Sequence, residues 1–325
     1  MEDNIKSRVV GVDISVKRTT YAIVDVRGNI VAQDCFPTND YPDVNEYISV
    51  LSEKIVELTE ANGGYDTIRS IGISAPSANF LTGCVENAAN LPWKGIVPLA
   101  AMLRDRLGIA VGVANDAHVT ALGEHAYGRA HGMKNFIIIA LGHGIGSCIF
   151  SDGRAHLGYE GFAGEIGHTT YIPDGRVCGC GQRGCMEAYC AQKGIILTAK
   201  EMLAESDQPS LMRNLPEINP RTIAECCEQG DEMAIEVYRR TGEILGFVMA
   251  NYASIIDPEA IIFTGGIANA GHWLLDPACE TFDKYVFRSI KGRVKFLRSS
   301  FNNRERDVLG ASALAWGIKE YSLFK

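Results

Sequence analysis

The segment from Gly164 to Glu187, GEIGHTTYIPDGRVCGCGQRGCME, constrains the fold of this chain more than any other stretch. It gathers one His, three Cys, two Glu and several Gly into a run too irregular for a helix or a strand. Three thiolates and an imidazole suit tetrahedral Zn²⁺, and four protein ligands leave no open position for a catalytic water. The pattern therefore predicts a structural zinc site, with the ligands His168, Cys178, Cys180 and Cys185.

The glycines between these ligands are expected to provide the tight turns and positive φ angles that closely spaced thiolates require. They are Gly179, Gly181 and Gly184. The Cys-x-Cys spacing is tighter than the usual spacing of zinc ligands. A reduced, glycine-rich surface loop with unrelated thiols is therefore the alternative interpretation.

The runs GEIGH at 164–168 and CGCGQRGCME at 178–187 resemble the signature of the ROK family (repressors, open reading frames, sugar kinases). The resemblance implies that the four predicted ligands hold zinc and that Glu165, His168 and Glu187 contact sugar hydroxyls. It also implies an α/β fold with two actin-like domains of the ribonuclease H-like, hexokinase type. The sugar is then expected in a cleft between the domains, with zinc fixing the positions of the glutamates.

Bulk properties exclude several classes of protein. With 325 residues, 46% of them hydrophobic, the chain is long enough for two modest domains. A net charge of −8 argues against a nucleic-acid partner, which would need a basic face. The polar N-terminus and the lack of any run of about 18 apolar residues predict a cytoplasmic protein without a membrane anchor. Its ten cysteines are expected to be thiols or metal ligands rather than disulfides.

The resemblance implies two actin-like α/β domains. The first covers residues 1–125 and is completed by the C-terminal helix at 308–325. The second, larger domain covers residues 126–307 and carries the metal segment.

Residues 8–36 predict three successive strands with the first turn at residues 15–18. In actin-like ATPases this opening carries an Asp-x-Gly-Gly-Thr loop that holds nucleotide phosphates, and the resemblance assigns Asp13, Lys17 and Thr19 to nucleotide binding. The chain departs from that loop because Ser15, Val16 and Lys17 replace Gly, Gly and Thr. Lys17 and Arg18 either bind phosphate through their charge or form a solvated turn.

A helix is predicted over residues 44–60, capped by Asp43, and a buried strand over 68–74. The following stretch, up to residue 98, resembles the family's sugar-facing loops and implies that Asn90 contacts the sugar. For Asn79 a role in forming a turn is favoured over sugar binding. Trp93 is expected in the core or the wall of the site.

A helix around residues 98–107 is followed by the strand IAVGVA, which leads into Asn115 and Asp116 and then into a helix. Open α/β sheets bind ligands at this kind of position. The residues alone leave two roles open, general base or helix N-cap. The run VANDAHVTALGE resembles the family's catalytic motif, which implies that Asp116 is the general base and Asn115 a sugar contact. His118 replaces the family's common Asn and is left unassigned.

Two glycine-rich turns are predicted to contact the nucleotide. A strand over 135–142 leads into Gly142, Gly144 and Gly146, which resemble the family's second phosphate loop with His143 in place of Thr. Gly265 and Gly266 follow a strand at 260–264 and resemble the adenosine loop. Ordinary tight turns use the same residues, and this alternative stays open.

The remaining elements are predicted as a helix over 186–204, a loop or lid over 205–219, a helix over about 231–256, a strand over 295–300 and a C-terminal helix. The resemblance, which spans nearly the whole chain, implies an ATP- and Mg²⁺-dependent kinase that phosphorylates the 6-hydroxyl of a glucose-like hexose or an N-acetylhexosamine. A homodimer is a family expectation. The rival hypothesis is a sugar-binding regulator that has lost phosphate handling, because both phosphate loops are altered. A DNA-binding repressor is not expected, since only about seven residues precede the first strand.

Overall fold

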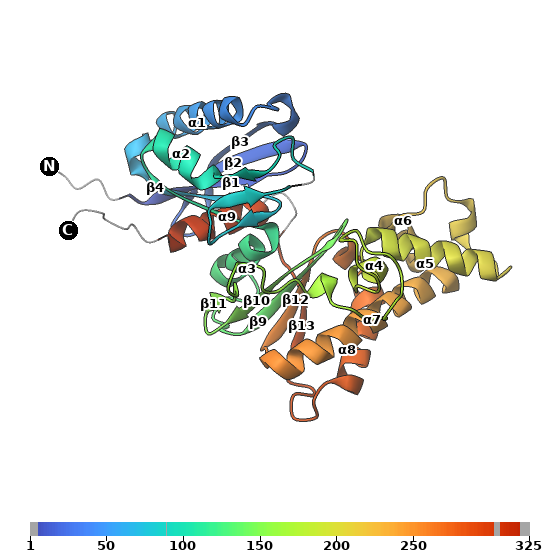
Figure 1. The fold of residues 1–325 in the computed structure, drawn as a ribbon. Coiled ribbons are helices and arrows are strands. Elements are labelled where there is room, and N and C mark those ends of the chain that lie inside the picture. Colours follow the sequence, from blue (N-terminus) through green and yellow to red (C-terminus); the bar gives the residue numbers. More distant parts are fainter. Residues whose placement is uncertain (1–5, 89, 302–305, 319–325) are drawn as a thin grey trace. The chain divides into compact units, whose positions relative to one another are not determined.

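The computed structural model describes residues 6–88, 90–301 and 306–318 (Figure 1). The chain divides into two compact units. Unit 1 contains the described residues up to Gly132, the short segment Leu157–Phe162 and the described residues from Ser300 onward. Unit 2 contains Met133–His156 and Ala163–Ser299. The divisions thus fall near residues 132 and 299, where the sequence predicted 125 and 307.

Unit 1 is built on a five-stranded sheet with the order β3-β2-β1-β4-β8. The predicted meander is confirmed as β1 (Arg8–Ile14), β2 (Arg18–Asp25) and β3 (Ile30–Pro37), which pair antiparallel. β4 (Ile68–Ser74) and β8 (Ala110–Ala114) run parallel to β1. The carboxyl ends of β1, β4 and β8 therefore meet at one edge of the sheet.

Helices cover both faces of this sheet (Figure 1). On one face α1 (Val44–Glu60) and α2 (Leu99–Leu107) bury apolar side chains against β1 and β4. On the other face lie α3 (Asp116–Tyr127) and α9 (Arg306–Gly317). A Cβ on Gly11 would lie 2.3 Å from the carbonyl oxygen of Val308, so α9 reaches the sheet only because that position has no side chain.

The stretch between β4 and α2 is more regular than the predicted loops. It forms a small antiparallel sheet of β5 (Ala78–Asn79), β6 (Cys84–Glu86) and β7 (Ile96–Val97). Trp93 is 4% exposed and donates to the carbonyl oxygen of Tyr41 at 3.2 Å, which confirms its expected place in the core.

Unit 2 has its own five-stranded sheet with the order β11-β10-β9-β12-β13. β9 (Phe136–Leu141) and β10 (Ile145–Ser151) form a hairpin, and β11 (Arg154–Ala155) extends it. β12 (Ala260–Thr264) lies parallel to β9, and β13 (Lys295–Arg298) lies parallel to β12. The middle strands β9 and β12 consist almost entirely of buried apolar residues, as expected for strands covered on both faces.

The helices of unit 2 follow the metal segment. The predicted helix at 186–204 is interrupted at Ala191, whose ψ of 172° separates α4 (Glu187–Cys190) from α5 (Gln192–Glu205). The long helix is confirmed as α7 (Glu232–Ile256), capped by Asp231. α6 (Pro220–Glu228) and α8 (His272–Tyr285) are not expected from the sequence. Within the described ranges, no helix combines the length and apolar character needed to cross a membrane.

Candidate active site and metal centre

Polar side chains meet where β1, β4 and β8 end. Asp13 lies opposite Ser74 in the parallel pair β1 and β4. Ser74 donates from its hydroxyl to Oδ1 of Asp116 at 3.0 Å, and Asp116 itself follows β8 as the first residue of α3. Ser74 is buried and Asp116 is exposed. The edge of the sheet thus presents a carboxylate to solvent, held in place by a buried hydroxyl.

The structure distinguishes between the two roles that the sequence left open for Asn115 and Asp116. Asn115 is the N-cap of α3, with an extended backbone (φ −72°, ψ 162°) and a side-chain oxygen that accepts from the amide of His118 at 2.8 Å. Asp116 is already helical and is not the cap.

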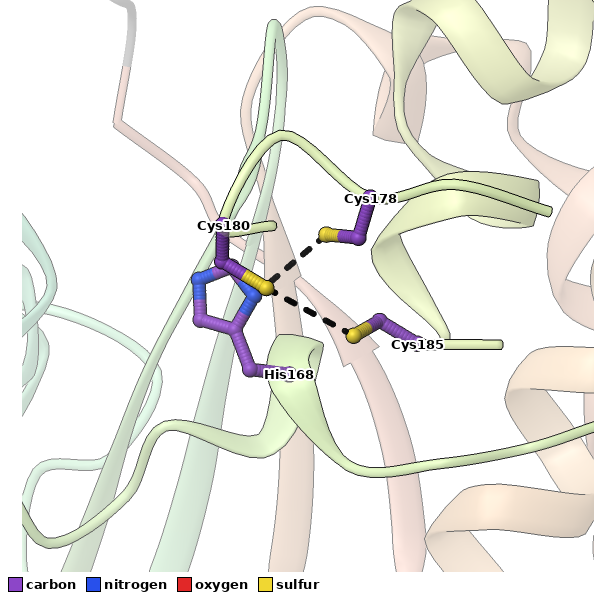
Figure 2. A group of neighbouring side chains, drawn as sticks. All are labelled: His168, Cys178, Cys180 and Cys185. Carbon is purple, nitrogen blue, oxygen red and sulfur yellow. Dashed lines mark hydrogen bonds between the residues drawn. The ribbon is translucent and has the colours of Figure 1, made fainter. Parts of the chain in front are cut away.

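The four predicted metal ligands lie together in unit 2 (Figure 2). Their ligand atoms all lie within 4.8 Å of one another. Nδ1 of His168 is 3.7 Å from Sγ of Cys178, and Sγ of Cys180 is 3.7 Å from Sγ of Cys185. Zn–S bonds of about 2.3 Å place two tetrahedral sulfur ligands about 3.8 Å apart. The donor set and its spacing therefore match a closed tetrahedral zinc site.

The backbone of the metal segment holds the ligands close together. Gly181 and Gly184 have φ angles of 92° and 79°, as predicted, whereas Gly179 does not adopt a positive φ. A Cβ on Gly184 would lie 1.7 Å from the carbonyl oxygen of Ile172, so only glycine fits there. Arg176 anchors the segment to α5 by donating to Gly194 and Thr198.

The thiols of the cluster differ in acidity because their surroundings differ. Burial raises the pKa of Cys178 to about 12. The pKa of the exposed Cys180 is lowered, chiefly by a hydrogen bond from the backbone of Gln182. A metal must replace the proton of Cys178, so its binding releases protons and weakens in acid.

The two glutamates that flank the metal ligands have different surroundings. Glu165 is exposed as a residue, but its carboxyl is partly desolvated, and this desolvation raises its pKa. His168 lowers the pKa, whereas the nearby Glu187 raises it further. Glu187 is half-buried at the start of α4, and both of its carboxylate oxygens have partners. Oε2 accepts from the amide of Ile145 at 2.8 Å, and Oε1 lies 3.4 Å from Sγ of Cys178.

The glycine-rich hairpin and the Gly265 turn line the same cavity of about 700 Å³. The tip of the hairpin is closed by a 3.0 Å bond from the amide of Gly142 to the carbonyl of Gly144. Gly265 has φ 89°, and a Cβ there would lie 2.2 Å from the carbonyl oxygen of Leu141. The residues that line the cavity include Gly142, His143, Gln192, Asn219, Arg221, Gly266 and Asn269.

The predicted nucleotide-binding residues at the first turn of unit 1 differ in their exposure to solvent. Lys17 is exposed at the tip between β1 and β2, where the Ser15 hydroxyl donates to the carbonyl of Arg18 at 2.7 Å. Thr19 is fully buried, and its hydroxyl lies 2.7 Å from the hydroxyl of Tyr47 and 3.0 Å from that of Thr38. Because this hydroxyl is enclosed in the core, the assignment of Thr19 to nucleotide binding is not retained.

The remaining sugar candidates separate in the same way. Asn90 is exposed in a turn of unit 1. Asn79 is buried, donates to the carbonyl of Glu160 at 2.9 Å and accepts from the amide of Leu81, so it shapes a turn as favoured above. His118 is buried in α3 beside the ring of Phe80.

Sequence reasoning missed two contributors. Ser74 is the last residue of a buried strand and lies next to Asp13. A hydroxyl at the carboxyl end of a parallel strand is the sequence signal that would have identified it. Asn219 lines the cavity and forms a capping box with Thr222 at the start of α6. The pattern Asn-Pro-x-Thr marks such a helix start in the sequence.

The fold and the site define a class of protein. Both units have the actin-like ATPase fold, as sugar kinases of known structure do. The model of the ROK family matches residues 9–317. The chain therefore belongs to the ROK family.

The similar proteins include enzymes and regulators. The chain is 30% identical to a glucokinase of Halalkalibacterium halodurans, over 96% of this chain and 94% of that protein. It is 26% identical to a xylose repressor of Caldicellulosiruptor bescii, over 94% of this chain and 77% of the repressor. A ROK family glucokinase from Streptomyces griseus, solved in complex with glucose and AMPPNP, is 27% identical with a TM-score of 0.74, covering 95% of this chain and 99% of that one.

Proposed function

We propose that this protein is a sugar kinase that transfers the γ-phosphoryl group of ATP to the 6-hydroxyl of a hexose. The observation that carries the proposal is the pair Asn115 and Asp116. Because Asn115 caps α3, Asp116 is available as the base, exposed at the edge of the sheet and oriented by Ser74. The hexose oxygen forms a bond to phosphorus, the bond to ADP breaks, and Asp116 takes the hydroxyl proton.

The proposed sugar contacts are supported by the kinds of group they offer. Carboxylates and amides recognise sugar hydroxyls by hydrogen bonding. The proposed residues are Asn90, Asn115, Asp116, Glu165, His168 and Glu187. The substrate class, a glucose-like hexose or an N-acetylhexosamine, follows the glucokinases among the relatives.

The His168 cluster is proposed to hold one structural Zn²⁺ through Cys178, Cys180 and Cys185. The ion supplies shape rather than chemistry, because four protein ligands close its coordination. His168 is proposed both as a zinc ligand and as a sugar contact, and its Nδ1 lies 3.7 Å from Sγ of Cys178.

The proposed nucleotide site uses backbone more than side chains. Gly142, Gly144 and Gly146 of the hairpin and the turn at Gly265 and Gly266 are proposed to hold ATP, since bare backbone approaches phosphate and nucleoside closely. The cavity of unit 2 that includes Gly142 and Gly266 supports this assignment. Asp13 and Lys17 remain proposed contacts for the phosphates and their Mg²⁺.

The experiment is coupled ADP release with Mg²⁺ and ATP against a panel of hexoses and N-acetylhexosamines. Turnover on at least one sugar is expected, and Asp116→Asn is expected to lower kcat by about a hundredfold or more. The variant should keep the thermal midpoint of the wild type, which separates loss of the base from misfolding. Turnover that survives in the variant would remove Asp116 from the role of base.

A sugar-binding regulator is the second candidate, and two observations favour it. Val16 and Lys17 occupy the first phosphate loop, His143 occupies the second, and the relatives include a xylose repressor. Calorimetry with the same sugar panel distinguishes the two functions. Hexose binding without turnover on any sugar would establish the regulator and reject the kinase.

A further inference from the structure

The tip of the hairpin between β9 and β10 is rich in glycine. Its tip contains Gly142, Gly144 and Gly146, and the side chain of His143, between the first two, is exposed. Glycine backbone is free to adopt many conformations, so a phosphate-binding arrangement of its amides needs support from outside the hairpin.

Glu187 provides such support from the other end of the metal segment. Its Oε2 accepts from the amide of Ile145 at 2.8 Å, and Ile145 is only 3% exposed. The carboxylate lies so close beneath the hairpin that a Cβ on Gly144 would be 2.7 Å from Oε2. A hydrogen bond from an amide to a carboxylate is stronger than one between neutral groups, so it restrains the hairpin.

Three further hydrogen bonds join the hairpin to the same part of unit 2. The hydroxyl of Ser147 donates to the carbonyl of Gly164 and accepts from the amide of Ile166 at 3.0 Å. The amide of Gln192 donates to the carbonyl of Gly142 at 3.0 Å. The hairpin thus rests on the segment before His168 and on the residues after Cys185.

Glu187 also lies beside the metal cluster. It follows the ligand Cys185 by two residues, and its Oε1 is 3.4 Å from Sγ of the ligand Cys178. A metal that holds Cys185 fixes the backbone that carries Glu187, and so restrains the carboxylate beneath Ile145.

We propose that Glu187 is a positioning residue for the hairpin, so that filling the metal site sets the affinity for the nucleotide as well as the shape of the sugar site. This inference rests on the proposed kinase function for its nucleotide ligand. It assigns to Glu187 a role that is independent of any contact with the sugar.

The test measures the affinity for Mg²⁺ and ADP by calorimetry, with no sugar present. Glu187→Ala is expected to weaken binding by at least about fivefold, because the amide of Ile145 loses its partner. Glu187→Gln keeps an acceptor oxygen at the same place and is expected to recover most of the affinity. Gly144→Ala should weaken binding like Glu187→Ala, since its Cβ pushes the carboxylate away.

Glu205→Ala is the control, because it removes an exposed carboxylate of unit 2 at the end of α5, outside the metal segment. Its affinity for ADP should equal that of the wild type. A second arm removes the metal with a chelator and restores it with Zn²⁺. ADP affinity should fall and then recover, and circular dichroism checks that the stripped protein is still folded.

Amide hydrogen exchange gives a readout that needs no ligand. The peptide that contains Ile145 should lose protection in Glu187→Ala and keep it in Glu187→Gln. Equal ADP affinity and equal protection in wild type and Glu187→Ala would overturn the inference while leaving the kinase proposal intact. A wild-type protein that does not bind ADP at all would overturn both.

Discussion

His118 is buried in α3, and its environment gives the protein an acid-sensitive component of stability. Its ring packs edge-on against Phe80, with centroids 5.4 Å apart, and burial lowers the pKa of the imidazole to about 4. The unfolded chain binds a proton at this residue below about pH 6.5, whereas the folded chain does so only near pH 4. The contribution of His118 to the stability of the folded state is therefore constant above pH 6.5 and decreases as the pH drops towards 4.

The first prediction follows from this difference. The contribution of His118 to the free energy of unfolding decreases by about 3 kcal/mol between pH 7.5 and pH 4. In His118→Asn this pH-dependent loss should be absent. Urea denaturation should therefore show that the free energy of unfolding of the variant rises relative to that of the wild type as the pH falls. His131→Asn, at an exposed histidine, controls for the loss of an imidazole. A difference between wild type and His118→Asn that stays constant with pH would contradict the prediction.

Thr19 carries the second prediction. Thr19→Val removes the hydroxyl that contacts Thr38 and Tyr47 and leaves the buried Tyr47 hydroxyl short of a partner. Unfolding should become easier by about 1–3 kcal/mol, while the KM for ATP should not change. Thr19→Ser keeps the hydroxyl and should lower the free energy of unfolding by less than Thr19→Val does. A normal stability with a raised KM would return Thr19 to the nucleotide site.

At this scale the sequence predicts which residue types gather but not which contacts they make. The metal ligands are evident because four of them share one short segment. The partner of Glu187 is not evident, because the amide of Ile145 lies 42 positions earlier and any residue type provides an amide. Likewise Asn115 and Asp116 are both good caps in the sequence, and only the backbone angles show which of them caps α3.

The contact between β12 and β9 depends on one glycine of an adjacent pair, and this gives the third prediction. Gly265 has φ 89° and leaves no room for a Cβ against Leu141, whereas Gly266 has φ −63° and nothing within 4 Å of a Cβ. Gly265→Ala should lower the free energy of unfolding by at least about 2 kcal/mol. Gly266→Ala should stay within about 0.5 kcal/mol of the wild type. Equal effects in thermal denaturation would show that the turn adapts.

Elements with strong local signals were predicted and those without were not. α1 and α7 have an apolar stripe and an Asp at the N-cap, and their bounds agree with the sequence to within a residue. β5, β6 and β7 are only two or three residues long, which is too short for an alternating pattern. α8 contains Pro277, which argues against a helix in the sequence, although the helix packs against α7.

The metal site gives the fourth prediction, which concerns the whole molecule. The purified protein should contain about one zinc per chain. Removal of the zinc should lower the thermal midpoint by at least about 5 °C, because the metal binds only the folded chain. Cys185→Ser, at a buried ligand, should reproduce the loss, whereas Cys279→Ser, outside the cluster, should not. Less than half occupancy together with an unchanged midpoint would show that the four side chains do not form a structural metal site.

Unit 1 is completed by a helix that follows unit 2 in the chain. The face of the first sheet that contains Gly11 and Gly72 is closed by α9, with Ser70 donating to Ala315 at 2.8 Å and a Cβ on Gly72 only 2.0 Å from the carbonyl oxygen of Ala311. Those partners follow the whole of unit 2 in the chain. During synthesis the first strands therefore wait, with one apolar face uncovered, while nearly all of unit 2 emerges and can fold ahead of them. Until α9 has been synthesised, the nascent first half of this protein therefore exposes the apolar surface that α9 later buries.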